Sequence, residues 1–199
     1  GTIYLAGPPL VKAATGEEIP EAGANAAVAM GGELGGTGTV AITEGSYNTA
    51  ENEMAAAFKK TMAEKFPDVK VLDPQLEGYE PSAAQSKAIA ILQADPSVTG
   101  AFSTTGNGAQ TWSGAARTAG RKLAIISMDY TRQNLDLVKA GEVYGIVAQP
   151  LYEEGAKAAE LAAALAEGKV VSYRNVLPAP VVTADGIAPY YKKLESAGQ

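Results

Sequence analysis

The sequence predicts an α/β protein with a doubly wound parallel sheet covered on both faces by helices, giving three αβα layers. Short β-branched runs alternate with alanine-rich stretches of helical periodicity along most of the chain. Strands and helices that alternate at this spacing are typical of parallel sheets. Helix ends are also marked, because Gly120 and Gly141 lie where a helix terminates in a residue that tolerates positive φ.

Each predicted strand is a short apolar run, and each predicted helix fills the interval that follows. The strands are expected at residues 2–6, 38–43, 69–72, 98–103, 123–127 and 144–148, and the helices at 21–34, 49–65, 81–94, 107–119, 131–140 and 151–167. Ser82 followed by Gln85 predicts a capping box for the third helix. Residues 7–20 are expected to be an irregular crossing segment, and 176–186 a short edge or crossover strand between prolines.

The composition excludes several classes of function. The chain has 199 residues, a formal net charge of −6, no cysteine and no histidine. A protein that follows nucleic-acid phosphates needs a cationic face, so no nucleic-acid partner is expected. The missing residue types remove thiol chemistry, most metal sites and the commonest general base, so we expect no metal and no cofactor. No run of about 18 apolar residues is present, so no membrane span is expected.

The glycine-rich segments do not match the motifs of nucleotide-binding enzymes. The segment GGTGTV, residues 35–40, comes after a predicted helix and before a strand, which is the wrong order for a dinucleotide fingerprint. The segment GNGAQT, residues 106–111, is in the right order but has Thr111 in place of the third glycine. A Ser–His–Asp triad is impossible without histidine. We therefore expect no catalytic residues, although an enzyme that uses carboxylates remains an alternative.

Polar and aromatic residues follow the carboxyl ends of successive predicted strands. The segments are EGSYNTAEN, EGYEP, TTGNG, MDYT and AQP. In open parallel sheets the ligand crevice lies outside these strand ends. Amides, hydroxyls, one carboxylate and flat aromatic rings suit a neutral polyhydroxylated ligand, whose hydroxyls need paired donors and acceptors and whose apolar face needs a ring to lie on.

Four stretches carry a resemblance to a known family: GTGTVAITEGSYNTAENEMAAAF, GYEPSAAQSKAIAILQADPSVTGAFSTTGNGA, AARTAGRKLAIISMDYT and DLVKAGEVYGIVAQPLYEEGAKAAELAAAL. They resemble the type I periplasmic, ribose-binding-like sugar-binding proteins of ABC importers over roughly residues 21–185. The resemblance implies an extracytoplasmic protein, in the periplasm or lipid-anchored outside the cell membrane, that closes two lobes around a sugar or polyol and delivers it to an ABC permease. The effector domains of LacI-type regulators share this fold and give the alternative function.

The resemblance also implies the ligand contacts. By position, Asp129 matches the ligand-contacting aspartate of the family, and Gln149 matches the amide beside the hinge. Tyr79 lies where the family has a stacking aromatic residue. The other interpretations are that Asp129 is a turn residue, that Gln149 only ties down the hinge, and that Tyr79 covers the lobe surface.

Two positions depart from the family pattern. Thr105 stands where the family usually has an asparagine, and it could also be a plain turn residue. The arginine of the family aligns with Met54, and the nearest polar residue on that turn is Asn52. These departures imply a ligand other than ribose or glucose, such as a deoxy-sugar or a polyol. The single tryptophan, Trp112, falls inside a predicted helix and is expected to pack in a core rather than on a sugar.

The resemblance divides the chain into four parts. Residues 1–20 are expected to be the last strand of an amino-terminal lobe and a crossing segment, and 21–149 the carboxyl-terminal ligand-binding lobe. Residues 150–178 return a helix and strand to the amino-terminal lobe, and 179–199 come back to the other lobe and end in a tail. Most of the amino-terminal lobe is then missing from this chain, so helix 151–167 is expected to expose an apolar face.

Overall fold

The computed structural model describes residues 11–198, so the strand predicted at residues 2–6 lies outside the described part of the chain. The chain divides into two compact units. Unit 1 comprises residues 1–18 and 149–179, and unit 2 comprises residues 19–148 and 180–199. Each unit is described by itself.

Unit 2 contains a mostly parallel sheet. Its strands are β2 (Gly38–Glu44), β3 (Val69–Val71), β4 (Gln75–Leu76), β5 (Val98–Ser103), β6 (Ala124–Met128), β7 (Gly145–Val147) and β9 (Val181–Thr183). Their order is β3-β2-β5-β6-β7-β9, and β4 pairs with β2 beside β3. Every neighbouring pair is parallel except β7 with β9, which is antiparallel.

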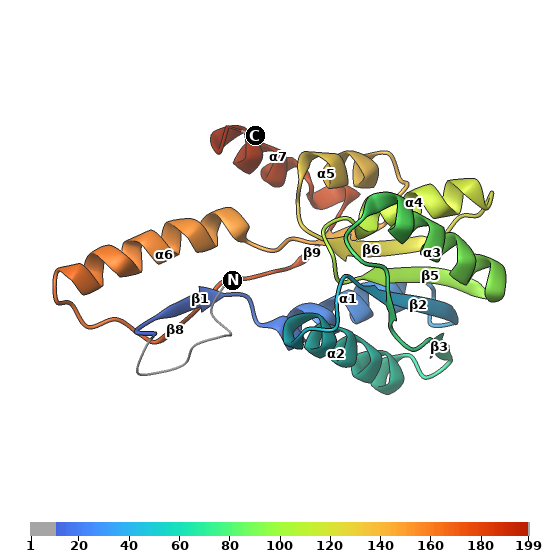
Figure 1. The fold of residues 1–199 in the computed structure, drawn as a ribbon, viewed down its shortest axis with the longest axis horizontal. Helices are drawn as coiled ribbons and strands as arrows, with labels where there is room; N and C mark the ends of the chain where they lie inside the picture. Colours follow the sequence, from blue (N-terminus) through green and yellow to red (C-terminus); the bar gives the residue numbers. More distant parts are fainter. Residues whose placement is uncertain (1–10, 199) are drawn as a thin grey trace. The chain divides into compact units, whose positions relative to one another are not determined.

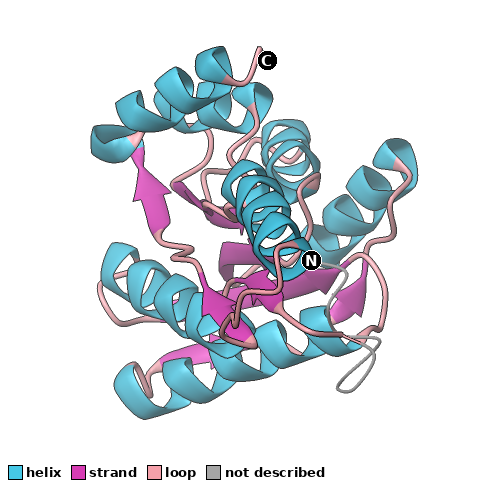
Figure 2. Ribbon diagram, turned by 90° about the vertical axis from the view of Figure 1, so that its left-hand side faces the viewer, coloured by secondary structure: helices cyan, strands magenta, loops and turns pink. Residues whose placement is uncertain are grey.

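Helices cover both faces of this sheet (Figure 1). One face carries α1 (Ile19–Glu33) and α2 (Thr49–Lys65), and the other carries α3 (Pro81–Ala94), α4 (Gly108–Thr118) and α5 (Arg132–Lys139). A last helix, α7 (Ala188–Ser196), packs against α5. Figure 2 shows the strands between the helices from a direction at right angles to the first view. The predicted α/β layering is confirmed.

The strands are apolar throughout because both faces of the sheet are buried. In β5, Phe102 stacks on Phe58 of α2 with a centroid distance of 4.5 Å. The preceding residue, Ala101, points to the other face and joins the cluster that contains the fully buried Trp112. The prediction that Trp112 is a core residue is therefore confirmed.

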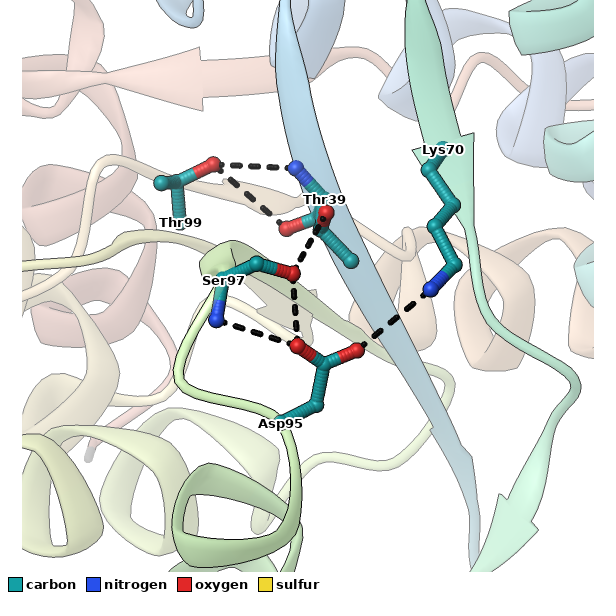
Figure 3. Close-up of polar contacts among 5 residues, drawn as sticks. All are labelled: Thr39, Lys70, Asp95, Ser97 and Thr99. Carbon is teal, nitrogen blue, oxygen red and sulfur yellow. Dashed lines mark hydrogen bonds and ion pairs between the residues drawn. The ribbon is translucent and has the colours of Figure 1, made fainter.

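A polar network fastens the amino-terminal ends of β2, β3 and β5 (Figure 3). Asp95 accepts hydrogen bonds from the backbone N–H and the hydroxyl of Ser97, and it pairs with Lys70 at 3.6 Å. The hydroxyls of Ser97 and Thr39 are hydrogen-bonded at 3.0 Å, and Thr99 Oγ1 accepts from the backbone N–H of Thr39. The hydrogen bonds from Ser97 lower the pKa of the Asp95 carboxyl. This network therefore lies at the amino-terminal ends of the strands, on the side of the sheet opposite the strand carboxyl ends.

Unit 1 is a small two-stranded arrangement with one helix. Its strands β1 (Ala14–Gly16) and β8 (Arg174–Val176) are parallel, and α6 (Leu151–Ala166) contacts β1. Within the described residues, only Glu154 and Leu161 of α6 are buried, whereas Leu151 is 51% exposed and Tyr152 is 58% exposed. The helix therefore has the exposed apolar surface that the sequence predicts.

Several local predictions are wrong. The expected irregular segment 7–20 contains β1, and the last 20 residues form α7 as well as a tail. The capping box is absent because Glu80 is the N-cap of α3 and accepts from the backbone N–H groups of Ser82 and Ala83, at 3.1 and 2.7 Å. By contrast, the expected positive φ values are present at Gly120 and Gly141, at 63° and 71°.

No helix in the described part of the chain combines the length and hydropathy needed to cross a membrane.

Candidate ligand site

The candidate site lies at the carboxyl ends of β2, β5 and β6. The chain runs from β2 outward to β3 on one side and then to β5 on the other side, so the winding direction reverses between β2 and β5. In doubly wound sheets, ligands bind outside the strand carboxyl ends at this reversal. The segments 45–48, 104–107 and 129–131 follow the three strands and form this edge.

Asp129 has an unusual backbone conformation directly after β6. Its φ is 70°, and it is the one non-glycine residue of the described chain with positive φ, a conformation that costs energy and clusters at functional sites. Its N–H donates to Val147 O at 2.9 Å. The fully buried amide of Asn134 donates to Asp129 O at 2.9 Å and to Gly106 O at 3.0 Å. These bonds hold the strained residue in place.

The Asp129 carboxylate lies against the glycine-rich turn after β5. A Cβ atom placed on Gly106 would be 2.3 Å from Asp129 Oδ2, so glycine is required for the close approach of the two segments. Asn107 precedes α4 at the N-cap position, but its side chain makes no capping hydrogen bond. The turn serves to bring the backbone beside the carboxylate.

Thr105 is buried next to this turn and hydrogen-bonded to a carboxylate. Its hydroxyl donates to Glu77 Oε1 at 2.5 Å, and Glu77 is only 2% exposed. Thr43 and Ser103 donate to the same carboxylate at 2.6 and 2.9 Å. Glu77 therefore joins the ends of β2 and β5 to the segment that follows β4.

Tyr79 packs against Gly45, and much of its surface is exposed. A Cβ atom on Gly45 would be 2.3 Å from Tyr79 Cε1, while 59% of the tyrosine surface remains exposed. The phenol donates to Glu51 Oε1 at 2.8 Å and is 3.0 Å from Ser46 Oγ. A fixed ring with an exposed face can stack on the apolar face of a sugar.

Asn52 is on the exposed side of α2 and faces a second buried acid. With its amide oriented to satisfy both atoms, its nitrogen donates to Glu44 Oε2 at 2.8 Å. Burial, together with the negative charge of Glu51, raises the pKa of the Glu44 carboxyl. Met54, at the position of the family arginine, is 3% exposed and packs in the core. No positive charge is therefore supplied from that position.

Gln149 belongs to unit 1 rather than to the edge formed by the other predicted residues. Its amide donates to Glu17 Oε1 at 2.9 Å. Burial of Glu17 and its hydrogen bond with Glu154 raise the pKa of Glu17 to about 7. The structure thus groups Asp129, Tyr79, Thr105 and Asn52 on unit 2 and ties Gln149 to Glu17.

Sequence reasoning missed the acids that organise the site, namely Glu44, Glu51 and Glu77. Glu51 accepts from Gly45 N at 2.6 Å and Thr104 Oγ1 at 2.7 Å, in addition to Tyr79. The available signal was the position of Glu44 at the end of a buried strand, but nothing in the sequence marks Glu77 as buried. Among residues 11–198, no group of three or more His, Cys, Asp or Glu side chains could hold a metal ion.

Comparisons with known proteins agree with this architecture. Residues 10–170 match the model of the periplasmic binding protein domain. A sugar-binding protein of a sugar ABC transporter from Bacillus halodurans is 25% identical, with a TM-score of 0.85 over 90% of this chain and 67% of that one. The arabinose-binding protein AraP from Geobacillus stearothermophilus is 25% identical, with a TM-score of 0.84 over 90% of this chain and 66% of that one.

A third similar structure is GanP, a glucose-galactose binding protein from Geobacillus stearothermophilus, at 22% identity and a TM-score of 0.83 over 89% of this chain. The chain spans 64% of the length of GanP, and about two thirds of the other two. The matched family is that of a binding-protein domain and these neighbours are named as sugar-binding proteins, in agreement with the prediction of a binding protein. With the family model matching residues 10–170, the chain belongs to the periplasmic binding protein domain family.

Proposed function

We propose that the chain forms the ligand-binding part of an extracytoplasmic solute-binding protein that captures a sugar or polyol and delivers it to an ABC permease. The observation that carries this proposal is the edge of unit 2, where Asp129 is held in a strained conformation against Gly106, and where the exposed ring of Tyr79 and the side chain of Thr105 both lie against Gly45. A carboxylate accepts paired sugar hydroxyls, and the ring of Tyr79 offers a stacking surface. The sugar-binding names of the structural neighbours support the same ligand class.

Capture between two lobes is part of the proposal. Unit 2 supplies one ligand face, and unit 1 belongs to the amino-terminal lobe, whose remainder covers the exposed apolar surface of α6. Gln149 contacts the ligand from the segment where the chain leaves unit 2. Closure removes water from the ligand, and each polar group left unpaired then costs about 1–3 kcal/mol, which gives selectivity among sugars.

The ligand is proposed to differ from ribose and glucose, because two positions depart from the pattern of the ribose-binding-like family that the sequence resembles. Met54 is buried where that family has an arginine, and the Thr105 hydroxyl replaces an amide. A deoxy-sugar has fewer hydroxyls to pair than the parent sugar, and a linear polyol presents its hydroxyls in a different arrangement from a sugar ring. Ribose binding more tightly than every other compound tested would contradict this narrower assignment.

Calorimetric titration of the protein with D-arabinose, D-allose, D-glucose, D-galactose, D-ribose, 2-deoxy-D-ribose and xylitol tests the proposal. We expect at least one compound to bind with a dissociation constant of about 1 μM, which corresponds to a binding free energy of about −8 kcal/mol. Asp129→Ala should abolish that binding. The matched control is Asp95→Asn, which alters the network at the opposite edge of the same sheet (Figure 3) and should bind normally. Failure of the whole set to bind would reject the sugar or polyol assignment.

A further inference from the structure

Two carboxylates, those of Glu51 and Glu77, together accept hydrogen bonds from five hydroxyls at the ligand edge of unit 2. Glu77 is 2% exposed and accepts from Thr43, Ser103 and Thr105 at distances of 2.5–2.9 Å. These donors come from β2, from β5 and from the turn after β5. One buried acid therefore fixes the direction of three hydroxyl protons.

Glu51, in the first turn of α2, likewise fixes the direction of several donor protons, some of them in the segment that follows β2. It accepts from the Tyr79 phenol at 2.8 Å, from Thr104 Oγ1 at 2.7 Å and from Asn48 Nδ2 at 2.7 Å. It also accepts from the backbone N–H of Gly45 at 2.6 Å. These four donors, one of which is the phenol of the predicted stacking residue, are thereby directed toward the protein.

The nearest amide is turned inward as well. Both protons of the Asn134 amide are directed at backbone carbonyls, those of Gly106, Met128 and Asp129, at 2.9–3.0 Å. The ionised carboxylate of Asp129 can accept hydrogen bonds but cannot donate them. Neither of these two side chains beside the glycine-rich turn therefore offers a proton to a ligand.

A hydroxyl has one proton and two lone pairs, so a hydroxyl that donates to a carboxylate can only accept from a ligand. We propose that Glu51 and Glu77 are positioning residues that set the hydrogen-bond polarity of this edge, so that it selects ligand groups that donate. This inference rests on the proposed function and names the chemical class it recognises. The preferred ligand presents hydroxyl or ammonium protons to unit 2, and an analogue with fluorine or a methoxy group at the same position is rejected.

Monofluoro-deoxy analogues test this inference, because fluorine replaces a hydroxyl at nearly the same size but has no proton to donate. The compounds are the monofluoro-deoxy derivatives of whichever compound of the calorimetric panel binds most tightly, one for each of its non-anomeric hydroxyl groups. For the wild-type protein, we expect at least one fluorine position to weaken binding by about tenfold or more, the effect of leaving a buried acceptor unpaired.

Glu77→Gln reverses the polarity at Thr105. The glutamine amide donates to the threonine oxygen, which directs the hydroxyl proton toward the ligand. We expect the ratio of fluoro-analogue to parent dissociation constants to fall toward one at the sensitive position. Asp95→Asn makes the same carboxyl-to-amide change at the opposite edge and should retain the wild-type ratio. A simple loss of stability would lower the fraction of active protein in both variants and leave both ratios unchanged.

Thr105→Val provides a second variant that does not remove a buried acid. It deletes the proposed acceptor with little change in volume, so the sensitivity to fluorine at that position should also disappear. If a parent sugar binds while both variants retain the wild-type ratio, the polarity inference is wrong and the proposed function stands. If no compound of the calorimetric panel binds the wild-type protein, the sugar or polyol assignment fails, and the polarity inference fails with it.

Discussion

The indole Nε1 of Trp112 donates a hydrogen bond to Thr43 Oγ1 at 2.9 Å. The Thr43 hydroxyl in turn donates to Glu77, the carboxylate that also binds Thr105. The single tryptophan of the chain, on α4, is thus connected through two side chains to the candidate ligand edge. Intrinsic fluorescence therefore reports on this network without any added label.

Thr43→Val should change tryptophan emission and lower stability. The substitution leaves a buried indole N–H without its acceptor, which costs about 1–3 kcal/mol. We expect a shift of the emission maximum and a lower free energy of unfolding in urea. Thr39→Val, on the same strand but in the network at its other end (Figure 3), should lower stability without shifting the emission. An unshifted spectrum in Thr43→Val would contradict the network.

Replacement of Asp129 should separate backbone strain from ligand contact. Because its φ is 70°, alanine at this position is strained by about 1–2 kcal/mol, whereas glycine is not. Urea denaturation should therefore show Asp129→Gly to be more stable than Asp129→Ala, and titration should show that neither variant binds sugar. Equal stabilities would indicate that the segment relaxes to negative φ in the variants.

Gly45→Ala should displace the proposed stacking ring. The added methyl group would be 2.3 Å from Tyr79 Cε1, so the ring must move away from its position on the backbone. We expect sugar affinity to fall by about tenfold, in line with the loss of an aromatic contact worth about 1 kcal/mol or more. Gly32→Ala on α1 is the control, because its Cβ meets nothing within 4 Å, and should raise stability by about 0.5–1 kcal/mol.

The stability of the protein should depend on the protonation of Glu17. Its pKa is raised from 4.5 to about 7 by burial and by the hydrogen bond with Glu154, so the folded state binds the proton more tightly than the unfolded state. This carboxyl therefore contributes stability that is present below about pH 4.5 and is lost as the pH rises to about 7. Urea denaturation between these pH values should show a smaller decrease for Glu17→Gln than for the wild type.

Thr15→Val is a suitable comparison for this pH series. The Thr15 hydroxyl is buried in the same unit and makes no hydrogen bond within the described residues, so its removal should leave the pH dependence unchanged. If Glu17→Gln retained the full wild-type slope, the pH dependence would have to come from other groups.

The elements with local signals could be predicted from the sequence. Helices α2 and α3 and strand β5 have the predicted bounds, because alanine-rich periodicity, flanking prolines and apolar runs are read within one segment. Strand β1 was missed because it has three residues and pairs with β8, far along the chain. Helix α7 was missed because tertiary contacts define it, such as the Tyr191 phenol on Asp136 at 2.6 Å.

The candidate site shows the same division. Asp129 and Tyr79 follow strands and could be found from their positions, although their ligand roles remain predictions. The role of Glu77 could not be found, because its three donors come from separate segments that only the folded sheet brings together. The N-cap at Glu80 was assigned to Ser82 because a serine cap is the commoner pattern, whereas two carboxylate oxygens here accept two N–H groups.

The pairing of β7 with β9 has a consequence for engineering the chain. Ala148 N donates to Pro180 O at 2.8 Å, so the points where the chain leaves unit 2 and returns to it are adjacent. Residues 149–179 are thus an inserted segment, and the sheet of unit 2 holds its two ends together. A turn of about two to five residues can bridge such ends. Residues 149–179 can therefore be removed, or exchanged for the equivalent segment of a relative, without breaking a strand of the unit 2 sheet.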